Sequence, residues 1–348
     1  IKISRPGDNN CLSLSAEFFK KAEKAWLQAD SMPRLPLRDW MPTEDDITTT
    51  LVEQNIPIIY GQPGLVKNDK HWHFNLDIFG SAFFMLSRYE ELITTDRDSH
   101  GRFPATASIA YKAGFLDRPI VNEYLEILWS CIHSIWPDLQ RKVYKVKNFI
   151  TCDTDWPFDP SLYDFKKMVF QVGRQLLKEY SPHRALSTLL NFSRNKFGFS
   201  VRDEFRENIS WMMDVNEKVD NNVAFYFITH NTSSFDTNED FDALKVRELF
   251  REIHQRGHEI GIHPGYSCYN NQENFKKTVE TLRRILKEEG IRQDAIGGRM
   301  HYLRWNASQT AQLWEDNDLD YDSTLMYADK AGFRCGTSDE FTMYNLVN

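Results

Sequence analysis

The sequence predicts an α/β protein in which a parallel sheet or β/α barrel follows a smaller N-terminal α/β domain. At 348 residues the chain is long for one ordinary domain, and two domains of ~150–200 residues are the natural expectation. Residues 149–348 alternate strand-like and helical segments, which is typical of parallel sheets and β/α barrels. Residues 1–148 follow a different pattern, so we divide the chain between residues 148 and 149.

Composition indicates a globular protein and disfavours several partners. The chain is 41% hydrophobic and 26% charged, as in ordinary folded proteins. Its net charge of −8, without a run of Lys or Arg, disfavours nucleic acid and anionic membrane surfaces as partners. No apolar run approaches the ~20 residues needed to span a bilayer. The five cysteines are scattered and form no CxxC pair, and the first residues do not resemble a signal peptide. Both observations favour a cytoplasmic protein. The sequence does not predict the oligomeric state.

The first domain contains three recognisable segments. A strand-like run covers residues 56–61, and apolar residues at helical spacing predict helices over 77–93 and 120–135. A turn-rich stretch, 96–104, separates the two helices.

The second domain predicts alternating strands and helices. Helices are expected over 241–255 and 273–288 and after Asn306. Residues 161–202 are long, basic and helical, and form an insertion that either shapes the cleft or only packs. The predicted strands are Phe149–Asp153, Val223–Thr229, Glu259–His263, Gly298–Leu303, Tyr321–Ser323 and Phe333–Gly336. In either architecture functional residues collect at the C-terminal ends of the strands.

Two such strand ends carry residues suited to metal chemistry. Asp153 and Asp155 point the same way on one strand, and paired carboxylates repel unless a cation or proton lies between them. The Asp-x-Asp pattern alone is also common in solvated turns. In the Gly257–Pro264 segment, His263 lies at the C-terminal end of the predicted strand, which Pro264 terminates. Neutral imidazole and carboxylate suit zinc and other divalent first-row metals.

These two segments, T-x-D-x-D and G-H-E-I-G-x-H, resemble the motifs of the polysaccharide deacetylase family of carbohydrate esterases. The resemblance covers roughly the last 200 residues and implies a distorted β/α barrel of polysaccharide-deacetylase type. It implies that Asp153 is the catalytic base and that Asp155 and His263 bind a divalent metal, zinc first, with cobalt, nickel or manganese as alternatives. His258, inside the strand, matches a structural position.

The chain departs from the family pattern at three places. Ser267 stands where the family has a second metal-binding histidine, and His301 is the candidate to complete the site. Arg299 lies near the position of the family's active-site arginine. The family's later strands, with an Asp–Trp pair and a catalytic histidine, do not follow before Asn348, so we expect an incomplete barrel. His230, after the second strand, is a candidate substrate contact or general acid, with a plain loop histidine as the alternative.

The first domain resembles a poorly characterised domain that precedes deacetylase domains in some bacterial proteins. The matching stretches are Phe83–Glu91 and Asp98–Pro104. This resemblance implies no activity for residues 1–148.

The resemblance implies a hydrolase that removes acetyl groups from N-acetylated sugars of a cell-surface polysaccharide or its precursor. The metal would polarise the carbonyl and activate water, and Asp153 would accept the proton. A first alternative is a catalytically inactive relative that binds carbohydrate, because Ser267 and the absent motifs depart from the family. A more remote alternative is a metal-dependent glycosyltransferase, which would leave His263 without a role and lacks a Gly-rich phosphate loop.

Overall fold

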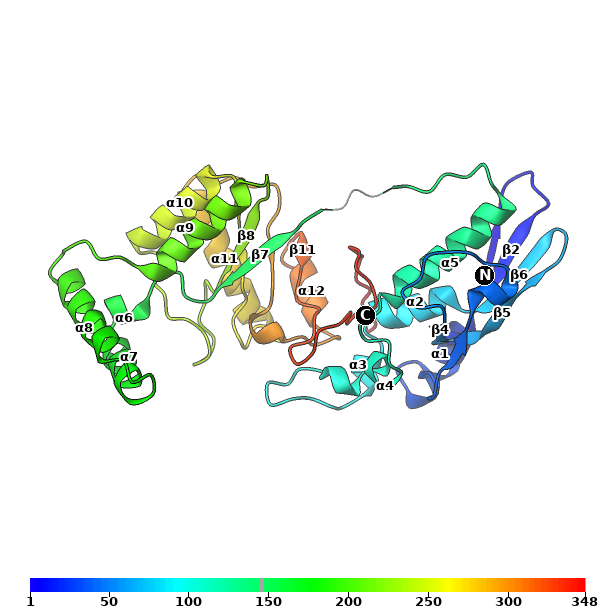
Figure 1. Ribbon diagram of the computed structural model, residues 1–348, viewed down its shortest axis with the longest axis horizontal. Coiled ribbons are helices and arrows are strands. Elements are labelled where there is room, and N and C mark those ends of the chain that lie inside the picture. Colours follow the sequence, from blue (N-terminus) through cyan, green and yellow to red (C-terminus); the bar gives the residue numbers. More distant parts are fainter. Residues whose placement is uncertain (144–146, 348) are drawn as a thin grey trace. The chain divides into compact units, whose positions relative to one another are not determined.

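The computed structural model describes residues 1–143 and 147–347 and divides into two compact units. The first comprises Ile1–Lys145, Tyr302–Asp318 and Ser323–Asn348, and the second comprises Val146–His301 and Leu319–Asp322 (Figure 1). Most of the chain after residue 301 therefore groups with the first unit. The division into functional domains at residues 148 and 149 stays a prediction.

The first unit is built on a mixed four-stranded sheet in the order β1-β2-β6-β5. β2 and β6 are parallel, and the outer pairs are antiparallel. Its strands are β1 Lys2–Ser4, β2 Cys11–Leu14, β5 Gly61–Lys67 and β6 His71–Leu76, and a separate antiparallel pair is formed by β3 Arg38–Trp40 and β4 Ile56–Ile58. Of these strands, the sequence pattern predicted the one at residues 56–61.

The helices of the first unit include the predicted one at residues 120–135. They are α1 Glu17–Ala25, α2 Ile78–Leu86, α3 Glu90–Ile93, α4 Ile109–Lys112, α5 Ile120–Ile135 and α12 Thr310–Glu315. α5 buries Tyr124, Leu128 and Cys131, as its spacing predicts. The helix predicted over 77–93 is instead broken into α2 and α3, because Arg88 has a left-handed φ of 55°.

The second unit contains a curled parallel sheet of five strands in the order β11-β10-β9-β8-β7. The strands are β7 Ile150–Thr154, β8 Val223–Phe227, β9 Glu259–Ile262, β10 Gly297–Gly298 and β11 Tyr321–Asp322. Every residue of β8 is buried, as expected for a central strand of a parallel sheet. The mixed α/β class is confirmed, while a closed barrel is not observed among the described residues.

Helices connect these strands in the pattern that the sequence predicts. α9 Glu204–Glu217, α10 Leu244–Gln255 and α11 Gln272–Glu288 alternate with β8 and β9. α10 and α11 each bury one apolar face and are followed by glycines in the left-handed region, Gly257 and Gly290. Gly298 permits the close approach of β10 to β9, because a Cβ there would lie 1.8 Å from the Ile262 carbonyl oxygen.

The predicted insertion forms α6 Pro160–Tyr163, α7 Phe165–Leu177 and α8 Pro182–Lys196. The Asp164 side chain accepts a hydrogen bond from the Lys167 amide and caps α7. In Figure 1, α7 and α8 lie side by side as a hairpin that projects away from the sheet of their own unit. No helix among the described residues combines the length and apolarity needed to cross a membrane. All five cysteines are free thiols.

Two predicted strands differ from the structure. The segment Phe333–Gly336 is not a strand, because its backbone pairs with the first unit: the Phe333 amide donates to the Leu116 carbonyl, and the Val121 amide donates to the Gly336 carbonyl, both at 2.8 Å. The segment Gly298–Leu303 is shorter than predicted. β10 ends at Gly298, and residues 301–303 form a 3-10 turn in which Tyr302 and Leu303 have positive φ.

A buried ion network holds the C-terminal segment within the first unit. The Glu91 carboxylate accepts bonds from Arg88 Nε at 2.9 Å and from Arg334 Nε and Nη2 at 2.8 Å, and all three side chains are at most 2% exposed. Burial raises the pKa of Glu91, but the charges of Arg334 and Arg88 outweigh burial and lower it to about 2. The Phe83–Glu91 stretch thus has a structural role here.

We expect Glu91→Gln to lower the free energy of unfolding of this unit by about 3–5 kcal/mol, because it leaves the buried Arg334 without its carboxylate and leaves Arg88 paired with Glu90 alone. Chemical denaturation of the full chain measures this change. Glu126→Gln is the matched control, since its pair with Arg141 is exposed and is worth less than about 1 kcal/mol.

The difference in the free energy of unfolding between wild type and Glu91→Gln should depend on pH. Because the pKa of Glu91 is lowered from 4.5 to about 2, its contribution is complete above pH 4.5 and is lost as the pH falls toward 2. The difference between wild type and Glu91→Gln should therefore shrink over that range. A difference that stays constant down to pH 2 would contradict the network.

Candidate metal centre

The carboxyl edge of the parallel sheet gathers the polar residues that the sequence singles out. Asp155 directly follows β7, His263 directly follows β9, and Arg299 and His301 follow β10. Parallel strands end at the same edge of a sheet, so these positions are brought together by topology. All of these residues belong to the second unit.

Backbone pairing continues past the strand ends and sets the two histidines side by side. The His263 amide donates to the Phe227 carbonyl at 2.8 Å, and the His301 amide donates to the Pro264 carbonyl at 3.0 Å. The His263 and His301 rings consequently have centroids 4.9 Å apart and planes inclined by 61°. The pairing explains why a histidine from the segment after β10 reaches the end of β9.

Three potential ligand atoms converge at this point. Asp155 Oδ1 lies 3.4 Å from His263 Nε2 and 3.7 Å from His301 Nε2, and the three atoms all lie within 4.8 Å of one another. Ligands about 2.1 Å from a tetrahedral ion are about 3.4 Å apart, so two of the separations are close to that spacing. Ser267, which replaces the family's second histidine, is not one of the three.

The hydrogen bonds of the two histidines decide which ring nitrogens carry protons. His263 Nδ1 donates to the Arg299 carbonyl oxygen at 2.5 Å, and His301 Nδ1 donates to Asp236 Oδ1 at 2.8 Å. Both partners are acceptors, so each neutral ring holds its proton on Nδ1 and presents a lone pair on Nε2. The two lone pairs point into the same space as Asp155 Oδ1.

The Asp155 carboxylate supplies the third acceptor. Its Oδ1 is buried without a hydrogen-bond partner among the described residues, while the side chain as a whole is 49% exposed. Burial raises the pKa of Asp155, but a hydrogen bond from protonated His263 and the positive charge of protonated His263 and His301 outweigh burial, so the pKa is lowered. A divalent cation between the three side chains would replace those protons and favour the ionised carboxylate in the same way. An ionised carboxylate and two imidazole lone pairs without shared protons fit a divalent cation, with the exposed side left open.

Asp236 is a functional candidate that sequence reasoning missed. Its side chain is fully buried and accepts bonds from His301 Nδ1, from the Tyr266 amide, and from the Thr232 amide and hydroxyl, at 2.7–2.8 Å. Burial raises the pKa of Asp236, but these hydrogen bonds lower it to about 2. Asp236 therefore orients the His301 ring and joins the loops after β8 and β9.

A close approach of the chain at Gly265 makes this arrangement possible. A Cβ at that position would lie 2.7 Å from Asp236 Oδ2 and 2.8 Å from Thr232 Oγ1. Asp236 lies in a loop with three other acids, Glu239, Asp240 and Asp242, and no spacing rule distinguishes it from them. Its position after a predicted strand is the one sequence signal that could have found it.

Arg299 links the candidate base to the candidate ligands. Its Nη1 donates to Asp153 Oδ1 at 2.9 Å and its Nη2 donates to Thr151 Oγ1 at 3.0 Å, while its carbonyl receives the His263 proton. The Asp153 side chain is 33% exposed, so its carboxylate is held at one oxygen and reachable by solvent. Asp153 and Arg299 thus lie together beside the cluster, as the resemblance implies.

His230 and His258 lie elsewhere. His230 lines a surface pocket with Lys277, Glu280, Thr281 and Arg284 of α11, so the structure does not bring it into the cluster; its catalytic role stays a prediction. His258 Nδ1 accepts a bond from the Val223 amide at 3.0 Å, and its Nε2 bonds Glu217 at 3.2 Å. His258 therefore joins β8, β9 and α9 and is structural.

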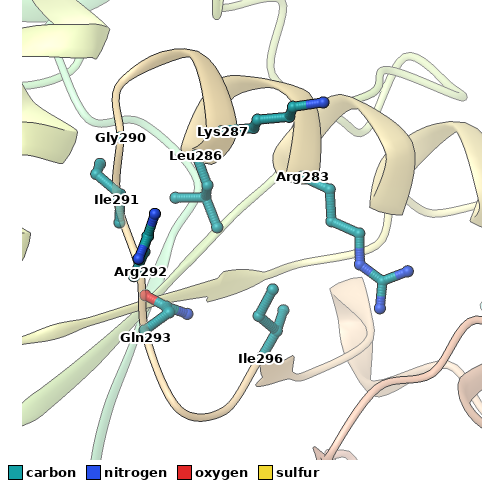
Figure 2. Close-up of a pocket in the computed structure, with 8 residues that line it drawn as sticks. All are labelled: Arg283, Leu286, Lys287, Gly290, Ile291, Arg292, Gln293 and Ile296. Atoms are coloured by element: carbon teal, nitrogen blue, oxygen red, sulfur yellow. The ribbon is translucent and has the colours of Figure 1, made fainter.

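A further pocket lies at the opposite end of β10. Figure 2 shows it between the last turns of α11, with Arg283 and Lys287, and the loop that leads to β10, with Ile291 and Gln293. Gln293 Nε2 donates to the Ile260 carbonyl and its Oε1 accepts from the Ile260 amide, so this loop holds β9 in place. The pocket is separate from the Asp155 cluster.

Comparison with known proteins adds little to this geometry. Residues 11–137 match the model of a family of unknown function (DUF7033). None of the curated proteins matches the sequence. A solved structure from Mycobacterium smegmatis, described as a candidate polysaccharide deacetylase, is similar with a TM-score of 0.30 and 18% identity over 51% of this chain. The chain spans about half the length of that protein, and such a TM-score is too low to assign a fold or a function.

If Asp236 orients His301, Asp236→Asn should weaken binding of a divalent metal by about 10–100-fold, because the His301 ring loses its charged acceptor. Competition with a chromophoric chelator measures the affinity. Asp240→Asn, in the same loop and exposed, is the matched control and should bind as wild type. Equal affinities for the two variants would show that the contact with Asp236 does not tune the site.

Proposed function

We propose that this chain is a metal-dependent hydrolase that removes acetyl groups from N-acetylated sugars of a cell-surface polysaccharide or its precursor. The observation that carries the proposal is the convergence of Asp155 Oδ1 with the Nε2 atoms of His263 and His301, whose Nδ1 protons are used elsewhere. Asp153 beside this cluster supplies a proton acceptor. The resemblance of both motifs to the polysaccharide deacetylase family supports the substrate class.

In this proposal Asp155, His263 and His301 hold a divalent ion, zinc first. When bound, the ion supplies Lewis-acid activation of a water molecule and of the scissile carbonyl. Asp153 accepts the proton of the attacking water. Arg299 fixes Asp153 Oδ1 through Nη1 and, through its carbonyl, fixes the proton of His263, so that one residue orients both the base and a ligand.

In this proposal His301 supplies the second imidazole ligand, which the family pattern has at the position of Ser267. The family pattern takes both histidines from one segment, whereas here the second imidazole comes from the neighbouring strand end. Three nitrogen and oxygen ligands with an open side are the arrangement of catalytic rather than structural zinc sites. The proposal therefore favours a hydrolase over an inactive carbohydrate binder. The five free cysteines support the proposal that the protein works in the reducing cytoplasm.

Elemental analysis of purified protein, together with acetate release from N-acetylglucosamine oligosaccharides, tests the proposal. Wild type should bind near-stoichiometric metal, and Asp155→Ala and His263→Ala should each lose it. Asp153→Asn should keep the metal and reduce acetate release at least about 100-fold, because it removes the base without removing a ligand. Lys276→Ala, on the exposed face of α11, should change neither property.

Two results would contradict the proposal. Wild type that binds no metal after incubation with zinc, cobalt, nickel or manganese would exclude the centre. Wild type that binds metal and oligosaccharide but releases no acetate would identify an inactive binder.

A further inference from the structure

The α7–α8 hairpin, residues 165–199, presents large apolar side chains to solvent. Phe170 is 72% exposed, Leu177 77%, Tyr180 83% and Phe197 79%. Phe165 and Phe199 are also more than half exposed. Scattered apolar residues are normal on protein surfaces, but a cluster of this size on one short hairpin marks an interaction surface.

Most of the exposed side chains are not the ones that hold the hairpin together, although the Phe165 ring also contacts Phe192 of α8, with the ring centroids 6.0 Å apart. α7 buries Met168 and Gln175, and α8 buries Ala185. At about 100° per residue, Phe165, Val169 and Leu176 form one stripe of α7, and Phe170 and Leu177 form a second stripe about 100° further round the helix. Lys166 and Gly173 lie between the two stripes. A separate outer apolar face therefore remains after the internal packing is complete.

Basic side chains accompany this apolar face. Residues 165–199 contain seven Lys or Arg residues and one acidic residue, Glu179, whereas the whole chain has 42 basic and 50 acidic residues. Lys167, Arg174 and Lys178 follow one another along the side of α7 beyond Phe170 and Leu177. The hairpin is thus strongly positive within a negative protein. The chain average, which disfavoured anionic membranes in the sequence analysis, conceals this local excess.

We propose that the hairpin docks on an anionic lipid surface, with its aromatic and aliphatic side chains in the interface and its Lys and Arg side chains at the headgroups. Helices with Phe and Leu on one face and Lys and Arg beside it bind in this way. Double-stranded nucleic acid would use the charges but leave the apolar side chains in water. Single-stranded nucleic acid would stack on the aromatic rings but leave the exposed aliphatic side chains, such as Leu177, in water. A second copy of the chain would bring two positive hairpins together, which charge repulsion opposes.

The hairpin surface shares no residue with the candidate metal centre, but the two lie close together in the sequence. α6 follows Asp155 after a short loop, so the hairpin departs from the same edge of the sheet that carries the ligands. Docking needs no hydrolytic activity, and the two proposals can fail separately.

Flotation of the full chain with vesicles tests the docking. Vesicles of phosphatidylcholine with about one third phosphatidylglycerol should bind the wild type at least about tenfold better than phosphatidylcholine alone. The double variants Phe170→Ser with Leu177→Ser, and Lys166→Glu with Lys178→Glu, should each weaken this binding about tenfold or more. The matched control is Trp211→Ser with Val219→Ser, which removes apolar side chains of similar exposure outside the hairpin and should bind as wild type.

Because the altered side chains are exposed, circular dichroism of every variant should match wild type. Wild type that does not float with anionic vesicles would overturn the proposal, and so would hairpin variants that float as well as the control. Sedimentation that shows a wild-type dimer, dissociated by the Phe170 and Leu177 changes, without vesicle binding, would instead assign the face to a second copy of the chain. Metal content, measured on the same samples, reports separately on the other site.

Discussion

The candidate metal centre depends on which ring nitrogens of His263 and His301 carry their protons. His263 and His301 each donate a hydrogen bond from Nδ1 to a buried acceptor, so both Nε2 lone pairs face Asp155. The Oδ1 atom of Asp155 has no hydrogen-bond partner among the described residues. Three acceptors in one small space repel one another unless a cation joins them. The backbone ladders that continue beyond β8, β9 and β10 hold this arrangement, and the glycines at 265 and 298 allow the segments to approach closely enough to form it.

The sequence predicted the part of the centre that depends on strand ends. The sequence singles out Asp153, Asp155 and His263 because each follows or ends a hydrophobic strand, and His301 because another ligand is needed in place of Ser267. Asp236 was missed because its importance comes from a hydrogen bond across two loops, and sequence spacing contains no information about such a bond. His230 shares the strand-end position but lines a surface pocket with residues of α11, so a strand-end position alone does not bring a residue into the cluster.

The fold was predicted where hydrophobic periodicity is strong, as in α5, α10, α11 and β8, and was mispredicted where buried polar contacts decide. Residues 77–93 have helical spacing, yet the chain turns at Arg88, whose guanidinium is satisfied by Glu90 and Glu91. Phe333–Gly336 has the composition of a strand, yet Arg334 is drawn into the same ion network. In both cases a buried charge that must be paired outweighs a local preference, because leaving it unpaired costs several kcal/mol. In a similar way, the net negative charge of the whole chain does not reveal the local positive charge of the α7–α8 hairpin.

X-ray absorption spectroscopy at the metal edge of zinc-loaded protein tests the central claim most directly. Zinc held by Asp155, His263 and His301 should give a shell of nitrogen and oxygen ligands at about 2.0–2.2 Å. Outer-shell scattering should show two imidazoles in the wild type and one imidazole in His301→Ala. A sulfur ligand at about 2.3 Å, or a spectrum unchanged by His301→Ala, would contradict this ligand set.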